Sequence, residues 1–208
     1  QDATGETLEE REALVTGEAL EAALARFRGE IAQVPPMYSA VKINGKKLYE
    51  LARKGKEVER KPRSVTIHAL ELLGRPEAGE DFQLRVRCSK GTYVRTLCHD
   101  IGQALGCGAC MSSLRRTVAA GYTLADAVTL EQVQERGEAL LRPLDSLFAQ
   151  YPALTVRSPG QEKRVRCGNP VTLPGTADGT YRLYGQAGDF LCLSQARGGE
   201  LTALKNFF

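Results

Sequence analysis

Apolar and polar residues alternate with two different periods in the first half of the chain, which predicts a mixture of helices and strands. Between a capping Thr16 and a terminating Gly29, four apolar residues recur at helical spacing: Leu20, Ala23, Leu24 and Phe27. The run 65–73 is rich in apolar and β-branched residues, which is typical of a strand. From 82 to 88, every second residue is apolar, so we expect a strand with one polar face.

A second helical pattern begins near Thr92 and ends at Gly106, and its apolar stripe consists of Val94, Leu97, Cys98, Ile101 and Leu105. The alternation of Leu114, Arg116 and Val118 predicts another strand. Thr129 and Gln132 then form a capping-box pattern before a short helix that ends at Gly137.

A hairpin signal lies between the first helix and the strand 65–73. Asn44-Gly45 is the dipeptide that a type I′ turn favours, because both central residues of that turn have φ above zero. Leu48, Leu51 and Ala52 follow at helical spacing, and Gly55 ends the run. We therefore expect a hairpin followed by a short helix.

The spacing of turn residues changes after Pro143. From about Tyr151 onward, short strand-like pieces alternate with turn dipeptides such as Pro174-Gly175 and Asp178-Gly179, which predicts a small all-β unit. The expected fold is α/β (α+β): a mixed, largely antiparallel sheet with helices in 1–149, and a small β-domain in 150–208.

Charge is distributed unevenly along the chain. Of the 208 residues, 42% are hydrophobic and 25% charged, as in an ordinary globular protein, and the net charge is only +3. Residues 41–67, however, contain nine lysines and arginines against three glutamates. Such a local surplus indicates a surface that faces phosphates. A solvated helix face of mixed charge is the alternative interpretation.

The segment 88–102 combines a polar-faced strand, a short Ser89-Lys90-Gly91 connection and a helix start. Backbone N–H groups at a helix start, the helix dipole and Lys90 all favour an anion there. Arg95 lies in the first turn, where a cation opposes the dipole unless an anion accompanies it. The pattern therefore predicts either a carboxylate or phosphate partner for Arg95, or a surface arginine on an amphipathic helix.

The six cysteines include one Cys-x-x-Cys pair, Cys107 and Cys110. A zinc site needs two more ligands, and no second pair has the required spacing, so we expect no metal site and free thiols in a reducing cytosol. His68 lies inside the strand 65–73 and is expected to be partly buried and structural. No apolar run approaches the length of a membrane span.

Two segments, 33–55 and 88–116, carry a resemblance to a known family. The segment 33–47 resembles the signature loop of the bacterial TruB-type tRNA pseudouridine synthases; its sequence is Gln33-Val-Pro-Pro-Met-Tyr-Ser-Ala-Val-Lys-Ile-Asn-Gly-Lys-Lys47. Cys88-Ser-Lys-Gly-Thr-Tyr-Val-Arg95 is similar to a catalytic-domain motif of the same family, and the resemblance continues to Leu114-Arg115-Arg116. The small β unit is similar to the PUA-like domain that ends this family.

The resemblance implies isomerisation of a T-loop uridine to pseudouridine in tRNA, without a metal or redox cofactor. It places Arg95 on the arginine that pairs with the catalytic aspartate, Tyr93 on the active-site tyrosine beside the target base, and Leu114 on the apolar wall of the uridine pocket. It also implies a cytoplasmic monomer whose partner is the tRNA T-arm, with a basic arm at 33–63 and no membrane. The residues expected to bind RNA are Lys42, Lys46, Lys47, Arg53, Lys54, Lys90, Arg115 and Arg116.

The nucleophile of that family is an aspartate in a Leu-Asp-Pro-x-Ala-Thr-Gly motif, which does not occur in these 208 residues. The opening Gln1-Asp2-Ala3-Thr4-Gly5-Glu6 matches a different, acidic segment of the family. We therefore expect the 208 residues alone to be inactive. Two alternatives remain open. One is a guide-RNA-dependent pseudouridine synthase, although the amino-acid sequence of 37–45 argues against it. The other is a non-catalytic RNA-binding module.

Overall fold

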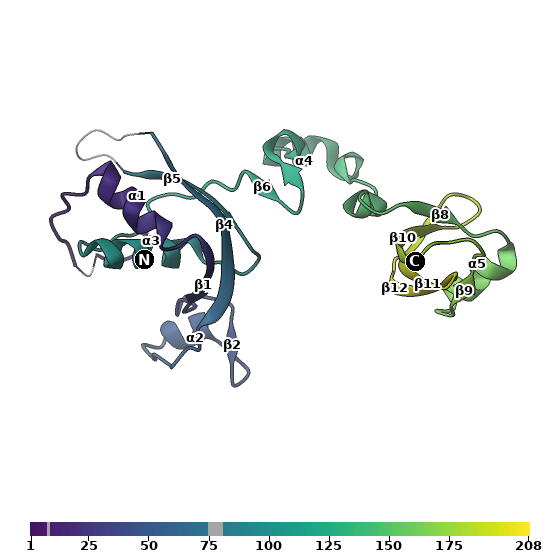
Figure 1. Ribbon diagram of the computed structural model, residues 1–208, viewed down its shortest axis with the longest axis horizontal. Helices are drawn as coiled ribbons and strands as arrows, with labels where there is room; N and C mark the ends of the chain where they lie inside the picture. The colour runs from purple at the N-terminus through teal and green to yellow at the C-terminus, as the bar shows by residue number, and fades with distance from the viewer. Residues whose placement is uncertain (8, 75–80) are drawn as a thin grey trace. The chain divides into compact units, whose positions relative to one another are not determined.

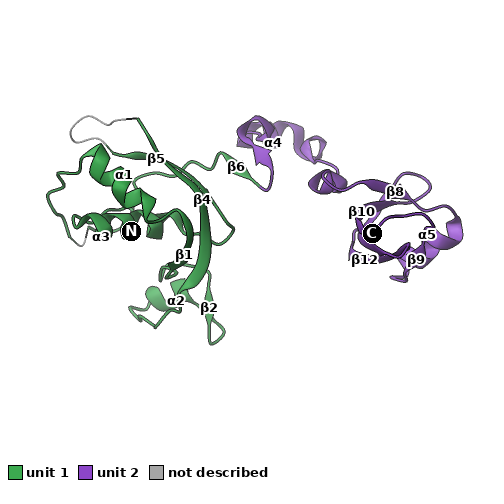
Figure 2. Cartoon of the chain, in the orientation of Figure 1, with its two compact units in different colours: residues 1–119 green, residues 120–208 purple. Residues whose placement is uncertain are grey.

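The computed structural model describes residues 1–7, 9–74 and 81–208, and the chain forms two compact units, 1–119 and 120–208 (Figure 2). This division lies upstream of the boundary expected near residue 150, and the expected domain assignment stays a prediction. The mixed α/β fold with largely antiparallel sheets is confirmed. Within the described ranges, no helix has both the length and the hydropathy to cross a membrane.

The first unit is built on an antiparallel sheet in the order β1-β4-β5 (Figure 1). These strands are β1 (Gly29–Gln33), β4 (Arg63–Leu73) and β5 (Gln83–Cys88). Two helices, α1 (Gly17–Ala25) and α3 (Val94–Leu105), supply the rest of the core. The buried residues shared among these elements are Leu20, Leu24, Ile67, Leu70, Leu97 and Ile101. Full burial of one such side chain is worth about 1.5–3 kcal/mol, so this cluster fixes how α3 lies on the sheet.

Local sequence signals specify both helices of this core. The Thr16 hydroxyl accepts a hydrogen bond of 3.2 Å from the Ala19 N–H, which caps α1 as predicted. Gly106 ends α3 in the left-handed conformation with φ 83°, which glycine adopts without steric cost. The strands predicted over 65–73 and 82–88 are also confirmed, and β5 alternates between exposed and partly buried positions.

The prediction for His68 is wrong, because its side chain is exposed. The pairing of β4 with β5 shifts register between Ile67 and Ala69, which marks an irregularity at His68. Val65 and Ile67 are buried, so His68 lies on the opposite, exposed face of β4, as the alternation of side chains along a strand requires.

The expected hairpin consists of β2 (Lys42–Ile43) and β3 (Lys46–Lys47). Its turn residues Asn44 and Gly45 have φ values of 50° and 77°, as a type I′ turn requires. The helix α2 (Leu48–Ala52) follows directly, and Leu48 is buried at its start. The predicted hairpin and the short helix after it are therefore confirmed.

The strand predicted from Leu114 to Val118 is wrong over most of its length. Only β6 (Val118–Ala119) is extended and paired, and 112–117 has no regular secondary structure. The apolar positions of this pattern are exposed, so no buried face stabilises a longer strand.

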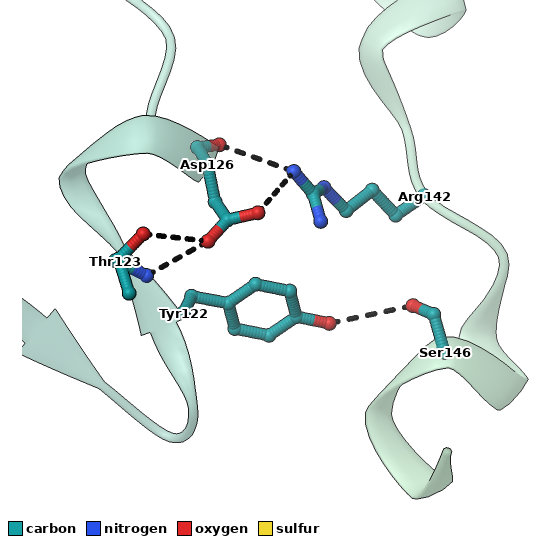
Figure 3. Close-up of polar contacts among 5 residues, drawn as sticks. All are labelled: Tyr122, Thr123, Asp126, Arg142 and Ser146. Atoms are coloured by element: carbon teal, nitrogen blue, oxygen red, sulfur yellow. Dashed lines mark hydrogen bonds and ion pairs between the residues drawn. The ribbon is translucent and has the colours of Figure 1, made fainter.

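The second unit begins with β7 (Tyr122–Thr123), the 3₁₀ turn η1 (Leu124–Asp126) and α4 (Leu130–Arg136). The predicted capping box of Thr129 and Gln132 is confirmed. Two further 3₁₀ turns follow, η2 (Gly137–Leu140) and η3 (Leu144–Phe148). Figure 3 shows that polar contacts connect this segment: Asp126 accepts a 3.0 Å bond from Arg142, and the hydroxyls of Tyr122 and Ser146 lie 3.3 Å apart.

The remainder is a five-stranded sheet in the order β8-β10-β11-β12-β9. Its strands are β8 (Ala153–Thr155), β9 (Val171–Thr172), β10 (Gly179–Tyr184), β11 (Phe190–Arg197) and β12 (Glu200–Asn206). The expectation of an all-β unit is wrong in one respect, because α5 (Pro159–Arg166) lies within it. Ser158 caps α5 and Pro159 occupies its first turn, a helix-start signal that the frequent turns obscured.

Candidate active site

Tyr93 and Arg95 stand together at the start of α3. Tyr93 is the residue that precedes the helix, and Arg95 is the second residue inside it. The side-chain amide of Gln33, at the end of β1, holds Tyr93 by its backbone. The Tyr93 N–H donates to Oε1 of Gln33 at 2.8 Å, and Nε2 of Gln33 donates to the Tyr93 carbonyl at 3.1 Å. Gln33 is only 2% exposed, so these two bonds satisfy a buried amide.

The guanidinium of Arg95 lies against the loop that follows β1. Its Nη2 donates a hydrogen bond of 2.6 Å to the backbone carbonyl of Tyr38. The Tyr38 side chain itself is 61% exposed. A carbonyl neutralises little of a positive charge, so Arg95 keeps the capacity to pair with an anion.

Asp2 supplies negative charge near this helix start. Hydrogen bonds from the side chain and backbone of Thr4, assisted by the positive charge of Arg95, lower the pKa of the Asp2 carboxyl from its usual value. The chain start is tied to 111, because the Met111 N–H donates to the Gln1 carbonyl at 3.1 Å. Asp2 was not among the predicted site residues, and its acidic sequence context gave no sign of a link to Arg95.

The loop 33–39 connects this helix start to the basic arm. Pro35, Pro36 and Ser39 are buried, and Nη1 of Arg60 donates to the Pro35 carbonyl at 3.3 Å. The Ser39 carbonyl accepts a 3.1 Å bond from the Tyr49 N–H at the start of α2. The same short loop therefore contacts both the arm and, through Tyr38, Arg95.

The arm presents cations at its surface. Lys42, Lys46, Arg53 and Lys54 are exposed, and Lys47 is half-buried. The ring of Tyr49 lies between two of these cations, with Lys47 Nζ 5.4 Å and the Arg53 guanidinium 5.3 Å from its centroid. Cation–π contacts of this kind orient long side chains without neutralising their charge.

The remaining predicted site residues lie in connections. Lys90 is exposed in the turn between β5 and α3, and Arg115 and Arg116 are exposed in the segment 112–117. Leu114, expected to form the apolar wall of a base pocket, is 56% exposed in that segment. Its role and the RNA-binding roles of these cations stay predictions.

Thiols gather around α3 without forming a metal centre. Across 1–7, 9–74 and 81–208, no three His, Cys, Asp or Glu side chains are close enough to hold a metal ion. The turn 107–110 packs tightly on α3, because a Cβ on Gly102 would lie 2.1 Å from the Ala109 nitrogen. Burial raises the pKa of the Cys98 thiol, and the nearby Cys110 thiol adds to this shift. All six cysteines are free thiols.

Comparison with solved structures supports the fold of the chain. A chain of a crystallised Cbf5-Nop10-Gar1 complex matches with a TM-score of 0.65 at 22% identity, covering 96% of this chain and 64% of that one. A chain of an H/ACA ribonucleoprotein bound to a substrate RNA matches with a TM-score of 0.64 at 21% identity. At such identities the likeness concerns the fold alone.

Sequence comparison defines the family. Residues 1–94 match the N-terminal domain of the TruB family pseudouridylate synthases, and residues 95–149 match the tRNA pseudouridylate synthase B C-terminal domain. A tRNA pseudouridine synthase B of Azoarcus is 48% identical over 204 residues, covering 96% of this chain and 67% of that protein. One of Cupriavidus metallidurans is 44% identical over 211 residues, with the same coverage of both chains.

The chain therefore belongs to the TruB family of pseudouridylate synthases, as its motifs implied. It spans about two thirds of the length of these two curated relatives. A third, from Stutzerimonas stutzeri, is 52% identical over 161 residues and is covered over 52% of its length.

Proposed function

We propose that the full-length protein isomerises a T-loop uridine of tRNA to pseudouridine. The observation that carries this proposal is the joint placement of Tyr93 and Arg95 at one helix start, in contact with a loop that leads into a cationic arm. Arg95 can therefore form an ion pair with a carboxylate, and the neighbouring Tyr93 can face a base. The names of the relatives, tRNA pseudouridine synthase B, support the same assignment.

The reaction requires positioning and charge stabilisation. The target base is flipped out of the loop, and the aspartate of the family motif attacks the nucleotide. The bond between ribose C1′ and N1 of uracil breaks, the detached uracil rotates, and a bond from C1′ to C5 forms while the bond to the aspartate breaks and regenerates the carboxylate. C5 loses a proton and N1 gains one, so the product is an isomer of the substrate and no electrons leave. No metal or redox cofactor enters this scheme.

The predicted site residues take three roles in this scheme. Arg95 holds the aspartate ionised and oriented, because a nearby cation favours the charged carboxylate. Tyr93 and Leu114 shape a flat, dry slot for the base. Lys42, Lys46, Lys47 and Arg53 contact the T-arm backbone, and we place Lys54, Lys90, Arg115 and Arg116 on the same RNA-facing surface.

A guide-RNA-dependent synthase is the second candidate, and the fold shared with Cbf5 in the solved complexes favours it. Two observations support the stand-alone enzyme instead. The relatives named tRNA pseudouridine synthase B are 44–48% identical, whereas the solved Cbf5 complex chain is 22% identical. The amino-acid sequence of 37–45 also resembles that of the bacterial synthases that act without a guide RNA. We propose a cytoplasmic monomer that acts on the T-arm directly.

The test uses the full-length protein, purified without guide RNA or protein partners, and an unmodified tRNA transcript. Pseudouridine should form at one T-loop position, with chelator present and no other cofactor added. In a parallel assay, residues 1–208 alone should bind the tRNA but form no pseudouridine, because the Leu-Asp-Pro-x-Ala-Thr-Gly motif is not in this sequence. Absence of pseudouridine with the full-length protein, or its appearance only with a guide RNA, would overturn the proposal.

A further inference from the structure

A buried glutamine fixes the backbone immediately before the two predicted active-site side chains. Gln33 is 2% exposed, lies at the last position of β1, and makes both of its amide hydrogen bonds to Tyr93. These residues are 60 positions apart in the chain. A two-pronged contact between an amide and both polar groups of one backbone residue restrains its position and its rotation.

The contact fixes the residue directly before the helix, whereas the other hydrogen bonds of this connection hold Ser89 to Thr66 and the Thr92 hydroxyl to the Ser89 carbonyl. Tyr93 precedes α3, and its side chain makes no capping hydrogen bond. The residues before it form the Ser89-Lys90-Gly91 connection, in which Gly91 has φ 92°. The Tyr93 N–H lies outside the helical hydrogen-bond ladder, and Gln33 satisfies it.

Two contacts join the end of β1 and the residues after it to the start of α3. β1 ends at Gln33, which holds Tyr93, and five residues later the Tyr38 carbonyl accepts the bond from Arg95. Pro35 and Pro36 are buried between these two contacts and limit the backbone freedom of the connection. A change at Gln33 therefore acts on Tyr93 directly. It acts on Arg95 by two routes: along the connection 33–38 to the Tyr38 carbonyl, and through Tyr93 to the first turn of α3.

We propose that Gln33 is a positioning residue for pseudouridine formation, which holds Tyr93 and Arg95 in the geometry of the chemical step. This inference rests on the proposed function and goes beyond it, because Gln33 reaches neither the base nor the nucleophile in that scheme. Its effect is on placement. Misplacement of a reacting group by about 1 Å costs roughly a hundredfold in rate.

The experiment replaces Gln33 in the full-length protein and separates chemistry from binding. Gln33→Met keeps the length of the side chain and removes both hydrogen bonds. The single-turnover rate on a T-arm RNA should fall about tenfold to a hundredfold. The equilibrium dissociation constant for the same RNA should stay within about twofold, because the cations of the arm are unchanged.

A matched control exists in the second unit. The side-chain amide of Gln161 in α5 also makes two hydrogen bonds to backbone groups, here of two residues: Oε1 accepts from the Arg157 N–H at 2.7 Å, and Nε2 donates to the Thr172 carbonyl at 2.9 Å. Gln161→Met should leave the single-turnover rate unchanged. If Gln33→Met does not fold, Gln33→Asn retains a polar amide but is one methylene too short for both contacts, and it should show the same loss of rate.

A double-mutant cycle distinguishes positioning from a general effect on stability. In the Arg95→Ala background, Gln33→Met should lower the rate by only about twofold further, because residues that act as one unit are not additive. Full additivity, equal losses of rate and affinity, or a wild-type rate for Gln33→Met would each overturn the inference. Failure of the wild-type full-length protein to form pseudouridine would instead overturn the proposed function.

Discussion

The guanidinium of Arg95 donates a 2.6 Å hydrogen bond to the backbone carbonyl of Tyr38, across 57 residues of sequence. This bond holds a cation in the first turn of α3, where the helix dipole disfavours it. The sequence left open whether Arg95 is a simple surface arginine. The loop carbonyl holds its guanidinium, and its positive charge helps to lower the pKa of the Asp2 carboxyl, which supports the proposed role of Arg95.

Arg95→Ala in the full-length protein should slow the chemical step far more than it weakens RNA binding. Loss of a well-placed charge partner in a desolvated site typically costs about 2.7–4 kcal/mol, or roughly a hundred- to thousandfold in rate. Arg95→Lys should recover little, because an ammonium group does not reproduce the planar fork of a guanidinium. Single-turnover kinetics and equilibrium binding of the same T-arm RNA measure the two effects separately. Equal losses of rate and affinity would identify Arg95 as a phosphate contact.

Gly102→Ala should destabilise the first unit. The new Cβ would lie 2.1 Å from the Ala109 nitrogen and 2.3 Å from the Gly108 carbonyl carbon, so the turn 107–110 has to move away from α3. Overpacking of this kind typically costs about 1–3 kcal/mol. The measurement is the unfolding midpoint by circular dichroism.

The control for Gly102 is Gly160→Ala in α5, where a new Cβ would approach only the Ser158 hydroxyl, at 3.9 Å. Alanine is favoured over glycine in a helix by about 1 kcal/mol, so this variant should be as stable as the wild type or more stable. Equal midpoints for the two variants would mean that the turn does not pack on α3 as described.

Features with a local cause could be predicted from the sequence, whereas those set by distant contacts could not. The turn at Asn44-Gly45 and the end of α3 at Gly106 follow from φ preferences of single residues, and both are confirmed. The exposure of His68 also has a local cause, because this residue alternates with the buried Val65 and Ile67, and the apolar character of 65–73 as a whole obscured that alternation.

The candidate site divides in the same way. The motif around Tyr93 and Arg95 predicted both of these residues from the sequence alone. The contact of Gln33 with Tyr93 joins residues 60 positions apart, and a buried glutamine at a strand end has no periodic signature. The Tyr38 carbonyl is a backbone group, so the identity of the side chain gives no sign of its role.

Tyr184→Phe should lower the stability of the second unit and remove part of its pH dependence. The Tyr184 hydroxyl donates to the Asp145 carboxylate at 2.6 Å, and Nη1 of Arg182 donates to the same hydroxyl at 3.2 Å. Loss of such a hydrogen bond typically costs about 0.5–1.5 kcal/mol. The free energy of unfolding from urea titrations at neutral pH measures this cost.

The sign of the pH effect follows from the direction of the shift. Burial, together with the bond to Asp145, raises the pKa of Tyr184. The folded state therefore holds this proton more tightly than the unfolded state, whose tyrosine pKa is about 10. This contribution to stability is complete below about pH 10 and is lost as the pH rises through the folded-state pKa. Tyr181→Phe is the control, because the Tyr181 hydroxyl donates to the backbone carbonyl of Ala177 rather than to a carboxylate. If stability falls equally with pH in Tyr184→Phe and wild type, this coupling is absent.

Lys46→Ala combined with Lys47→Ala should weaken tRNA binding and flatten its salt dependence. Lys46 is exposed on the hairpin of the arm, and Lys47 is oriented by a 3.1 Å hydrogen bond to the Tyr49 hydroxyl. Each phosphate contact contributes about 0.7–0.9 to the slope of log K against log salt, so loss of two contacts should reduce the slope by about 1.4–1.8. Binding of the full-length protein to a T-arm RNA over a series of salt concentrations provides this slope. The double substitution to arginine keeps both charges and should retain the wild-type slope. A slope unchanged by the alanine pair would remove the arm from the RNA-binding surface, whatever its effect on affinity at one salt concentration.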